Sequence, residues 1–190
     1  MRIDGTFVAA GMVGAAIAAA VVVGAAPATR IALADNTVSV DPPAIIAGDG
    51  SLADGQIVTP FDVQNPAIGR LDPSLLDAIQ QAATAASAAG ITMTITSGWR
   101  SPEFQQRLLD SAVAQYGSLA AAREYVQTPE ASRHVVGEAV DVGGVGADQW
   151  LTANGARFGL CRIYANEVWH FELATDPAGN CPPMLTNAAG

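Results

Sequence analysis

From Leu71 onward, helix and strand patterns alternate between turn residues, and this alternation limits the fold more than any other feature of the chain. Asp72 can cap a helix that begins at Pro73, and Gly90 can end it. The following residues, ITMTIT at 91–96, combine β-branched and apolar side chains between turn residues, which is typical of a strand. We therefore expect short elements of both kinds in close succession.

The rest of the chain continues in the same way. Helices are predicted after the Ser101-Pro102 cap to about 115, at about 118–126 and around 147–157. Strands are predicted at 138–144 and in CRIYA and VWHFEL, which read as a hairpin through Asn166. Helices mixed with late strands on short connections predict an α+β domain with a small, mainly antiparallel sheet flanked by helices.

The N-terminal residues 1–34 have the pattern of an export segment. Arg2 precedes about 20 uncharged residues between Phe7 and Ala26, and the small residues of the 32–34 site follow. The run fits a cleaved signal peptide, an uncleaved membrane anchor or, least well, a buried core helix. Residues 35–70 then read as a linker or loosely packed arm, 71–184 as a single domain and 185–190 as a tail.

Charge and cysteine content narrow the choice of partners and compartment. The net charge of −9 gives no electrostatic footprint for nucleic acid. A membrane contact is expected only through an uncleaved anchor, and we expect a monomer. Cys161 and Cys181 are the two cysteines, and in an exported chain they are expected to form a disulfide, although two unrelated thiols would also fit.

The two histidines of the chain each lie near a carboxylate. His134 precedes Asp141 in SRHVVGEAVDV, and His170 follows Glu167 in EVWH. Two histidines and one aspartate can hold a zinc ion while leaving a fourth position open for water. Glu167 is then the candidate general base, because a second carboxylate is needed to accept a proton. Residues three apart on a strand face opposite ways, so we place Glu167 on the turn before the strand that carries His170.

These motifs resemble those of the VanY-type zinc D-alanyl-D-alanine carboxypeptidases, within the hedgehog/DD-peptidase superfamily. The pattern Ser132-x-His134-x-x-Gly137-x-Ala139-x-Asp141 is followed by Glu167-x-x-His170, and SGWRS at 97–101 is similar to the family's S-G-Y-R-S turn. The resemblance runs from about Ser97 to Phe171. It implies that His134, Asp141 and His170 bind one Zn²⁺ per chain and that Glu167 is the base.

The same resemblance implies roles for four further residues. Arg100 would hold a substrate carboxylate or a developing oxyanion, because its planar fork makes paired hydrogen bonds. Gln105 and Ser132 match positions that help to bind the end of the peptide, and Trp169 is expected to pack under the site. The residues themselves also allow a structural ion pair for Arg100, a helix-surface position for Gln105 and a turn cap for Ser132. Trp150 and Tyr164 are expected in the core.

The function implied is an exported zinc carboxypeptidase that removes a terminal D-amino acid, most simply D-alanine, from peptidoglycan stem peptides. An L,D-carboxypeptidase, a D,D-dipeptidase or an endopeptidase on the same zinc site stays open, and so does a non-catalytic zinc-containing cell-wall binding module. Glu167 argues against the binding module, because a binder needs no base. Arg133, Glu138 and the pair Val135-Val136 depart from the family pattern and bear on substrate preference.

Overall fold

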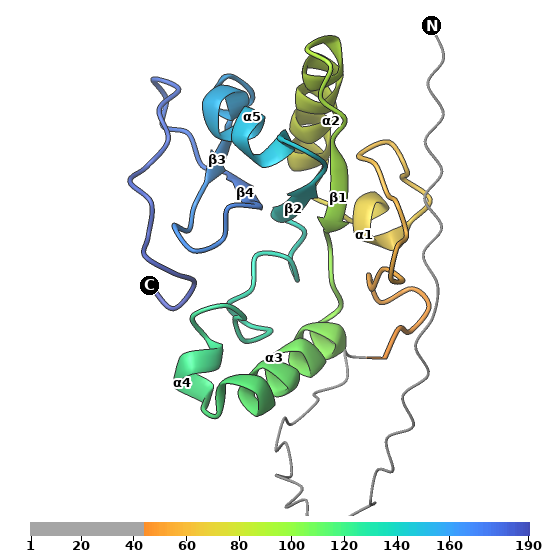
Figure 1. Cartoon of the computed structure of the whole chain (residues 1–190), viewed down its shortest axis with the longest axis vertical. Helices are drawn as coiled ribbons and strands as arrows, with labels where there is room; N and C mark the ends of the chain where they lie inside the picture. Colours follow the sequence, from red (N-terminus) through yellow and green to blue (C-terminus); the bar gives the residue numbers. More distant parts are fainter. Residues whose placement is uncertain (1–43) are drawn as a thin grey trace, which may run out of the picture. The chain divides into compact units, whose positions relative to one another are not determined.

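The computed structural model describes residues 44–190 (Figure 1). The predicted export segment at 1–34 and the first part of the predicted arm, 35–43, lie outside the described residues. Between residues 44 and 190, no helix is both long enough and apolar enough to cross a membrane.

Four short strands form one sheet in which every neighbouring pair is antiparallel. Across the sheet the order is β1-β2-β4-β3, with β1 at Thr94–Ser97, β2 at Ala139–Gly143, β3 at Leu160–Arg162 and β4 at His170–Leu173. The predicted α+β fold with a small antiparallel sheet is confirmed, including the late hairpin, whose strands are β3 and β4.

Strand β1 begins three residues later than the predicted strand at 91–96. The amide of Ile91 still donates to the carbonyl oxygen of Ala86 in the preceding helix, at 3.0 Å. Gly90 supplies the left-handed turn, with φ of 78°. The first residues after the glycine therefore close the helix, and pairing with β2 starts only at Thr94.

The two long helices begin where their capping residues predict. In α2 (Pro73–Ala88) and α3 (Pro102–Tyr116), the side chains of Asp72 and Ser101 accept hydrogen bonds from amides of the first turn. The shorter helices are α1 (Pro66–Gly69), α4 (Leu119–Ala122) and α5 (Ala147–Asn154), which continues into the 3₁₀ turn η1 (Gly155–Phe158). Helix α4 stops short of the predicted end near 126.

The two faces of the sheet carry different chemistry because side chains alternate along each strand. One face packs against α2 and forms the main apolar core; its members include Leu75, Ile79, Ile95, Val140, Val142, Leu151, Leu160 and Phe171. On the other face, Asp141 in β2 pairs directly with His170 in β4. A smaller apolar cluster around Leu109 and Ala122 joins α3 to α4, which lie apart from the main core (Figure 1).

The described part of the predicted arm, residues 44–70, is attached to the domain at defined points. The carbonyl oxygens of Val58 and Ala67 accept hydrogen bonds from the amides of Ile95 and Trp99, at 2.7 and 2.8 Å. The side chain of Ile68 is fully buried in the main core. A few buried side chains and main-chain hydrogen bonds therefore hold the arm, whereas the side chains of Ile45, Ile57 and Phe61 stay exposed.

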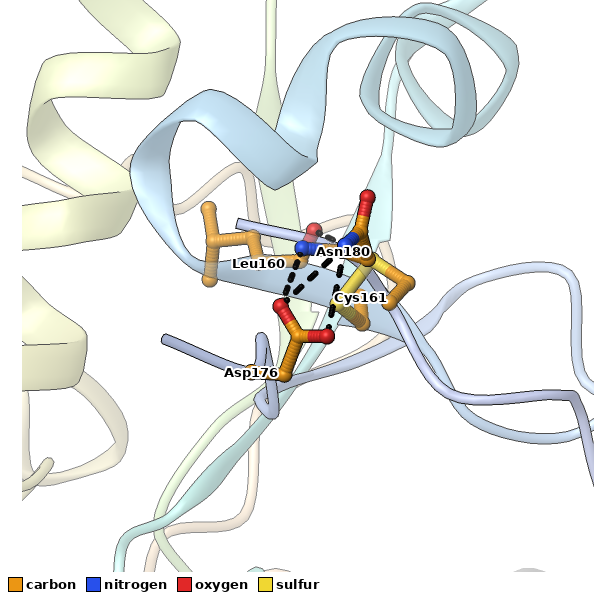
Figure 2. The surroundings of a disulfide bond; sticks show 5 residues. Leu160, Cys161, Asp176 and Asn180 are labelled. Carbon is orange, nitrogen blue, oxygen red and sulfur yellow. Dashed lines mark hydrogen bonds between the residues drawn. A yellow bond between two sulfur atoms is a disulfide. The ribbon is translucent and has the colours of Figure 1, made fainter. Parts of the chain in front are cut away.

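Cys161 of β3 and Cys181 form the predicted disulfide (Figure 2). The connecting chain makes a tight turn in which the Asp176 carboxylate accepts hydrogen bonds from the main-chain and side-chain amides of Asn180. After Cys181 the chain returns along the domain, and the expected tail at 185–190 makes defined contacts that are described below.

Candidate metal centre and adjoining pocket

Three buried side chains converge on the polar face of the sheet. Asp141 comes from β2, His170 from β4, and His134 from the turns that precede β2. One ligand atom from each lies within 4.8 Å of the other two. These are the three residues that the sequence motifs predict to lie together, and we call them the metal centre.

His134 is oriented by the turn that follows β1. Its Nδ1 lies 2.8 Å from the carbonyl oxygen of Gly98, so a proton on Nδ1 would be donated there. Gly98 fits because a Cβ at this position would meet the carbonyl oxygen of Ala67 at 2.0 Å. With Nδ1 protonated, Nε2 presents its lone pair to the metal centre.

His170 is oriented by a carboxylate that sequence reasoning missed. Its Nε2 lies 2.9 Å from Oε1 of Glu172, while its Nδ1 faces Oδ1 of Asp141 at 3.1 Å. Glu172 lies two residues after His170 on β4, and strand alternation could have placed both on one face. A carboxylate on the outer nitrogen of a metal-binding histidine fixes the tautomer and strengthens the ligand.

The metal centre therefore gathers three acceptor atoms and suits a cation. Nε2 of His134 lies 3.3 Å from Nδ1 of His170 and 3.3 Å from Oδ1 of Asp141. With both outer nitrogens protonated, these atoms have only lone pairs to offer one another, which favours a metal ion between them. Two imidazoles and one carboxylate are a ligand set that zinc accepts, and they leave a fourth position free.

The pKa values of the metal centre also show that its acceptor atoms favour a positive charge. Burial by itself lowers the pKa of His170, but its hydrogen bonds to Asp141 and Glu172 outweigh burial and raise this pKa to about 9. Burial favours neutral Asp141, yet His134, His170 and Arg100 hold its pKa well below the usual range. A proton and a metal ion thus compete for the Nδ1 lone pair of His170.

Glu167 lies beside the metal centre in the turn before β4, as its spacing predicts. Its Oε2 is 4.0 Å from Nδ1 of His170. Among the described residues, its buried Oε1 finds no hydrogen-bond partner. Burial raises the pKa of Glu167 to about 7, and the neighbouring Asp141 carboxylate acts in the same direction. A carboxyl group with this pKa can exchange a proton near neutral pH.

Arg100 is partly buried and makes three hydrogen bonds within the site. It donates to Oγ of Ser97 at 2.8 Å, to Oε1 of Gln105 at 3.1 Å and to Oδ2 of Asp141 at 2.9 Å. The ion pair with Asp141 leaves the Oδ1 atom of that carboxylate to the metal centre. Two of the five guanidinium N–H groups find no partner within residues 44–190.

Gln105 and Ser132 extend this polar network. The helix-surface interpretation of Gln105 is wrong, because its side chain is almost fully buried. Its Nε2 donates to the carbonyl oxygen of Gln127 at 2.8 Å, and its Oε1 also accepts from Oγ of Ser132 at 3.1 Å. The Ser132 hydroxyl thus bonds to another side chain and caps no turn.

A cavity of about 170 Å³ adjoins the metal centre. Besides residues of the site, its lining includes Tyr125, Val126, Gln127, Tyr164, Trp169 and Ala188. Trp169 is 42% exposed, so the expectation that it packs under the site is wrong; it lies at the pocket rim. Tyr164 lines the pocket instead of lying in the core, whereas Trp150 does pack against the main core.

Two of the residues that depart from the family pattern, Arg133 and Glu138, are linked to Glu172, the carboxylate that orients His170. Arg133 pairs with Glu138 at 2.7 Å and with Oε2 of Glu172 at 3.4 Å. Val136 is largely exposed. Gly137 provides the turn between His134 and β2, with φ of 77°, and a Cβ there would meet the carbonyl oxygen of Arg70 at 2.7 Å. Arg133 and Glu138 therefore support the site through Glu172.

The comparisons with known proteins agree with this geometry. The family model described as VanY, D-alanyl-D-alanine carboxypeptidase, matches residues 69–176. A D-alanyl-D-alanine carboxypeptidase of Enterococcus faecalis is 32% identical, over 54% of this chain and 47% of the relative. The chain thus spans about half the length of that curated relative.

Two solved structures have the same fold. A vancomycin-resistance D,D-pentapeptidase VanY in complex with Zn(II) is 31% identical, with a TM-score of 0.51, over 54% of this chain and 71% of that one. VanYB in complex with D-alanine-D-alanine is 30% identical, also with a TM-score of 0.51, over 54% and 70% of the two chains. The model match covers more than half of the sequence and contains every residue of the metal centre. The chain therefore belongs to the VanY family of D-alanyl-D-alanine carboxypeptidases.

Proposed function

We propose that this chain is an exported, zinc-dependent carboxypeptidase that removes the terminal D-alanine from peptidoglycan stem peptides. The observation that carries the proposal is the convergence of three acceptor atoms beside a carboxyl group with a buried, unpartnered oxygen. The Zn(II) and the D-alanine-D-alanine in the two solved relatives support the metal and the substrate class.

The ligand atoms are Nε2 of His134, Oδ1 of Asp141 and Nδ1 of His170. Their outer contacts, to Gly98, Arg100 and Glu172, orient each ligand. A bound zinc ion supplies Lewis acidity, which polarises a carbonyl group and makes a nearby water more acidic.

Glu167 is the general base in this proposal. Its Oε1 takes a proton from the water that attacks the scissile carbonyl carbon, and a new C–O bond forms. The C–N bond then breaks, and Glu167 returns the proton to the nitrogen of the leaving D-alanine. The buried position of its Oε1, which has no hydrogen-bond partner among the described residues, supports both steps because this atom is free to accept a proton.

Arg100, Gln105 and Ser132 bind the terminal carboxylate of the peptide in this proposal. The support is their shared hydrogen-bond network at one end of the pocket and the two N–H groups that Arg100 has left. A guanidinium can engage a carboxylate with two parallel hydrogen bonds. Trp169, at the rim, would cover the preceding part of the peptide.

The disulfide supports a site of action outside the cytoplasm, because such bonds persist in oxidising compartments. It agrees with the export pattern of residues 1–34 in the sequence. We propose that residues 71–184 are the catalytic part and that the protein acts as a monomer.

The test is hydrolysis of defined muropeptides, with products identified by mass, in zinc and in chelator. Glu167→Gln should lower kcat by about 10²–10⁴-fold, the usual contribution of general acid–base catalysis, while zinc content stays at one per chain. Glu103→Gln, an exposed glutamate on α3, is the matched control and should keep full activity.

The products also decide between the related activities. Release of single D-alanine supports the proposal. Release of a dipeptide would instead indicate a dipeptidase. Release of a terminal D-residue that follows an L-residue would indicate an L,D-carboxypeptidase, and separation of cross-linked fragments would indicate an endopeptidase. A zinc-loaded protein that cleaves no muropeptide would be a binding module.

A further inference from the structure

The segment after the disulfide, residues 182–188, reaches the pocket through Ala188, although it follows every family motif in the sequence. Its first anchor is Leu185. The amide of Leu185 donates to the carbonyl oxygen of Ile163, and the amide of Ala165 donates to that of Leu185, both at 2.9 Å. The segment therefore runs beside the stretch that leads to Glu167.

Its second anchor is Ala188. The amide of Ala188 donates to the carbonyl oxygen of Glu124, at 3.3 Å. The side-chain amide of Gln127 donates to the carbonyl oxygen of Ala188. In Figure 1 the last residues run from beside β3 towards α4, which agrees with these contacts.

Ala188 is 6% exposed and lines the pocket. Its neighbour Gln127 connects it to the end of the pocket where the substrate carboxylate is proposed to bind. The carbonyl oxygen of Gln127 holds Gln105, and Gln105 in turn holds Arg100 and Ser132. Ala188 therefore lies next to this polar end and not at the open rim that Trp169 occupies.

We propose that residues 186–188, through Ala188, form the end wall of the pocket and limit cleavage to the last residue of a peptide. This inference rests on the proposed function, because it assumes that Arg100, Gln105 and Ser132 receive the terminal carboxylate. A chain that continues past the terminal residue would collide with Ala188 and with the main chain around it. The wall thus makes Ala188 a specificity-determining residue.

The test compares two peptides, one ending in D-Ala-D-Ala and one with glycine added after the same ending. A variant that ends at Leu185 keeps the first anchor and removes the wall. We expect the full chain to prefer the shorter peptide and the shortened variant to reduce this preference at least tenfold in kcat/KM. An unchanged preference in the shortened variant overturns the inference.

A pair of point variants tests the wall without deletion. Ala188→Leu fills the pocket end and should weaken binding of the D-Ala-D-Ala peptide at least tenfold, measured by calorimetry in the zinc-loaded Glu167→Gln background. Ala189→Leu adds the same atoms at an exposed neighbour and should have no effect. Equal effects of the two variants overturn the inference.

The two measurements separate this inference from the proposed function. A full chain that releases D-alanine, but whose preference ignores residues 186–188, contradicts only the wall. A zinc-loaded full chain that neither cleaves nor binds the D-Ala-D-Ala peptide contradicts the proposed function and the wall together.

Discussion

The metal centre and the pocket wall differ in what holds them. His134, Asp141 and His170 are almost fully buried, and each is fixed by side-chain contacts on or next to the sheet. The pocket wall, residues 186–188, is held instead by main-chain hydrogen bonds of Leu185 and Ala188 to Ile163, Ala165 and Glu124 in separate loops. Strand register therefore determines the metal geometry, while the pocket depends on how separate loops are tied together.

Removal of the disulfide should loosen the pocket wall and leave the metal centre unchanged. Replacing both Cys161 and Cys181 with serine releases a loop of 20 residues, which the chain-entropy model values at about 3 kcal/mol of unfolding free energy. Zinc affinity should stay unchanged, whereas discrimination against the glycine-extended peptide should fall. Denaturant unfolding, zinc titration and the two-peptide assay measure these effects; a large loss of zinc affinity would show that the two regions are not separate.

Glu172→Gln should weaken zinc binding and leave the pocket wall unchanged. The amide keeps the shape but removes the negative charge that orients His170, and loss of such a contact usually weakens metal binding about 10–100-fold. Glu138→Gln is the matched control, because Glu138 also pairs with Arg133 but does not contact His170. Competition with a chromogenic chelator would measure both; similar losses in the two variants would assign the effect to Arg133.

Glu167 borders both regions, and its titration tests how strongly the metal centre acts on it. Its pKa of about 7 in the metal-free protein means that ionisation costs stability as pH rises through 7. Glu167→Gln should therefore gain stability relative to the native chain between pH 5 and pH 8 in chelator, as measured by melting temperature. A difference that shrinks over this range would contradict the raised pKa.

Zinc binding should shift the pKa of Glu167 in a defined direction. A nearby cation favours the carboxylate, so the pKa of Glu167 should fall below 7. Because the base must be ionised to accept a proton, kcat/KM should rise with pH along a limb that lies below 7. If kcat/KM rises only at a pH well above 7, the titrating group is not Glu167.

Local patterns predicted the metal centre because its members lie on or next to short strands. Asp141 and His170 come together through direct pairing of β2 and β4, and the turn residues Gly98 and Gly137 stand where only glycine fits. The same alternation implies Glu172, but a glutamate on a small sheet more often faces solvent. Helix periodicity alone allows a surface position for Gln105, because it cannot reveal a hydrogen bond to Gln127, 22 residues away.

The pocket wall could not be predicted in this way. Residues 182–188 have no periodic pattern, and their position depends on the disulfide and on main-chain hydrogen bonds to distant loops. The arm at 44–70 was hidden for the same reason, since Val58 and Ala67 bind the domain through carbonyl groups that every residue type possesses. Contacts made by the main chain leave little trace in the choice of side chains.

The position of Leu185 also bears on self-association. Residues 163–165 follow directly after the outer strand β3, and unpaired main-chain groups next to the edge of a sheet can recruit a strand from another molecule. Leu185 bonds to Ile163 and Ala165 and occupies this edge from within the same chain. The segment that closes the pocket should therefore also protect the protein against edge-to-edge aggregation.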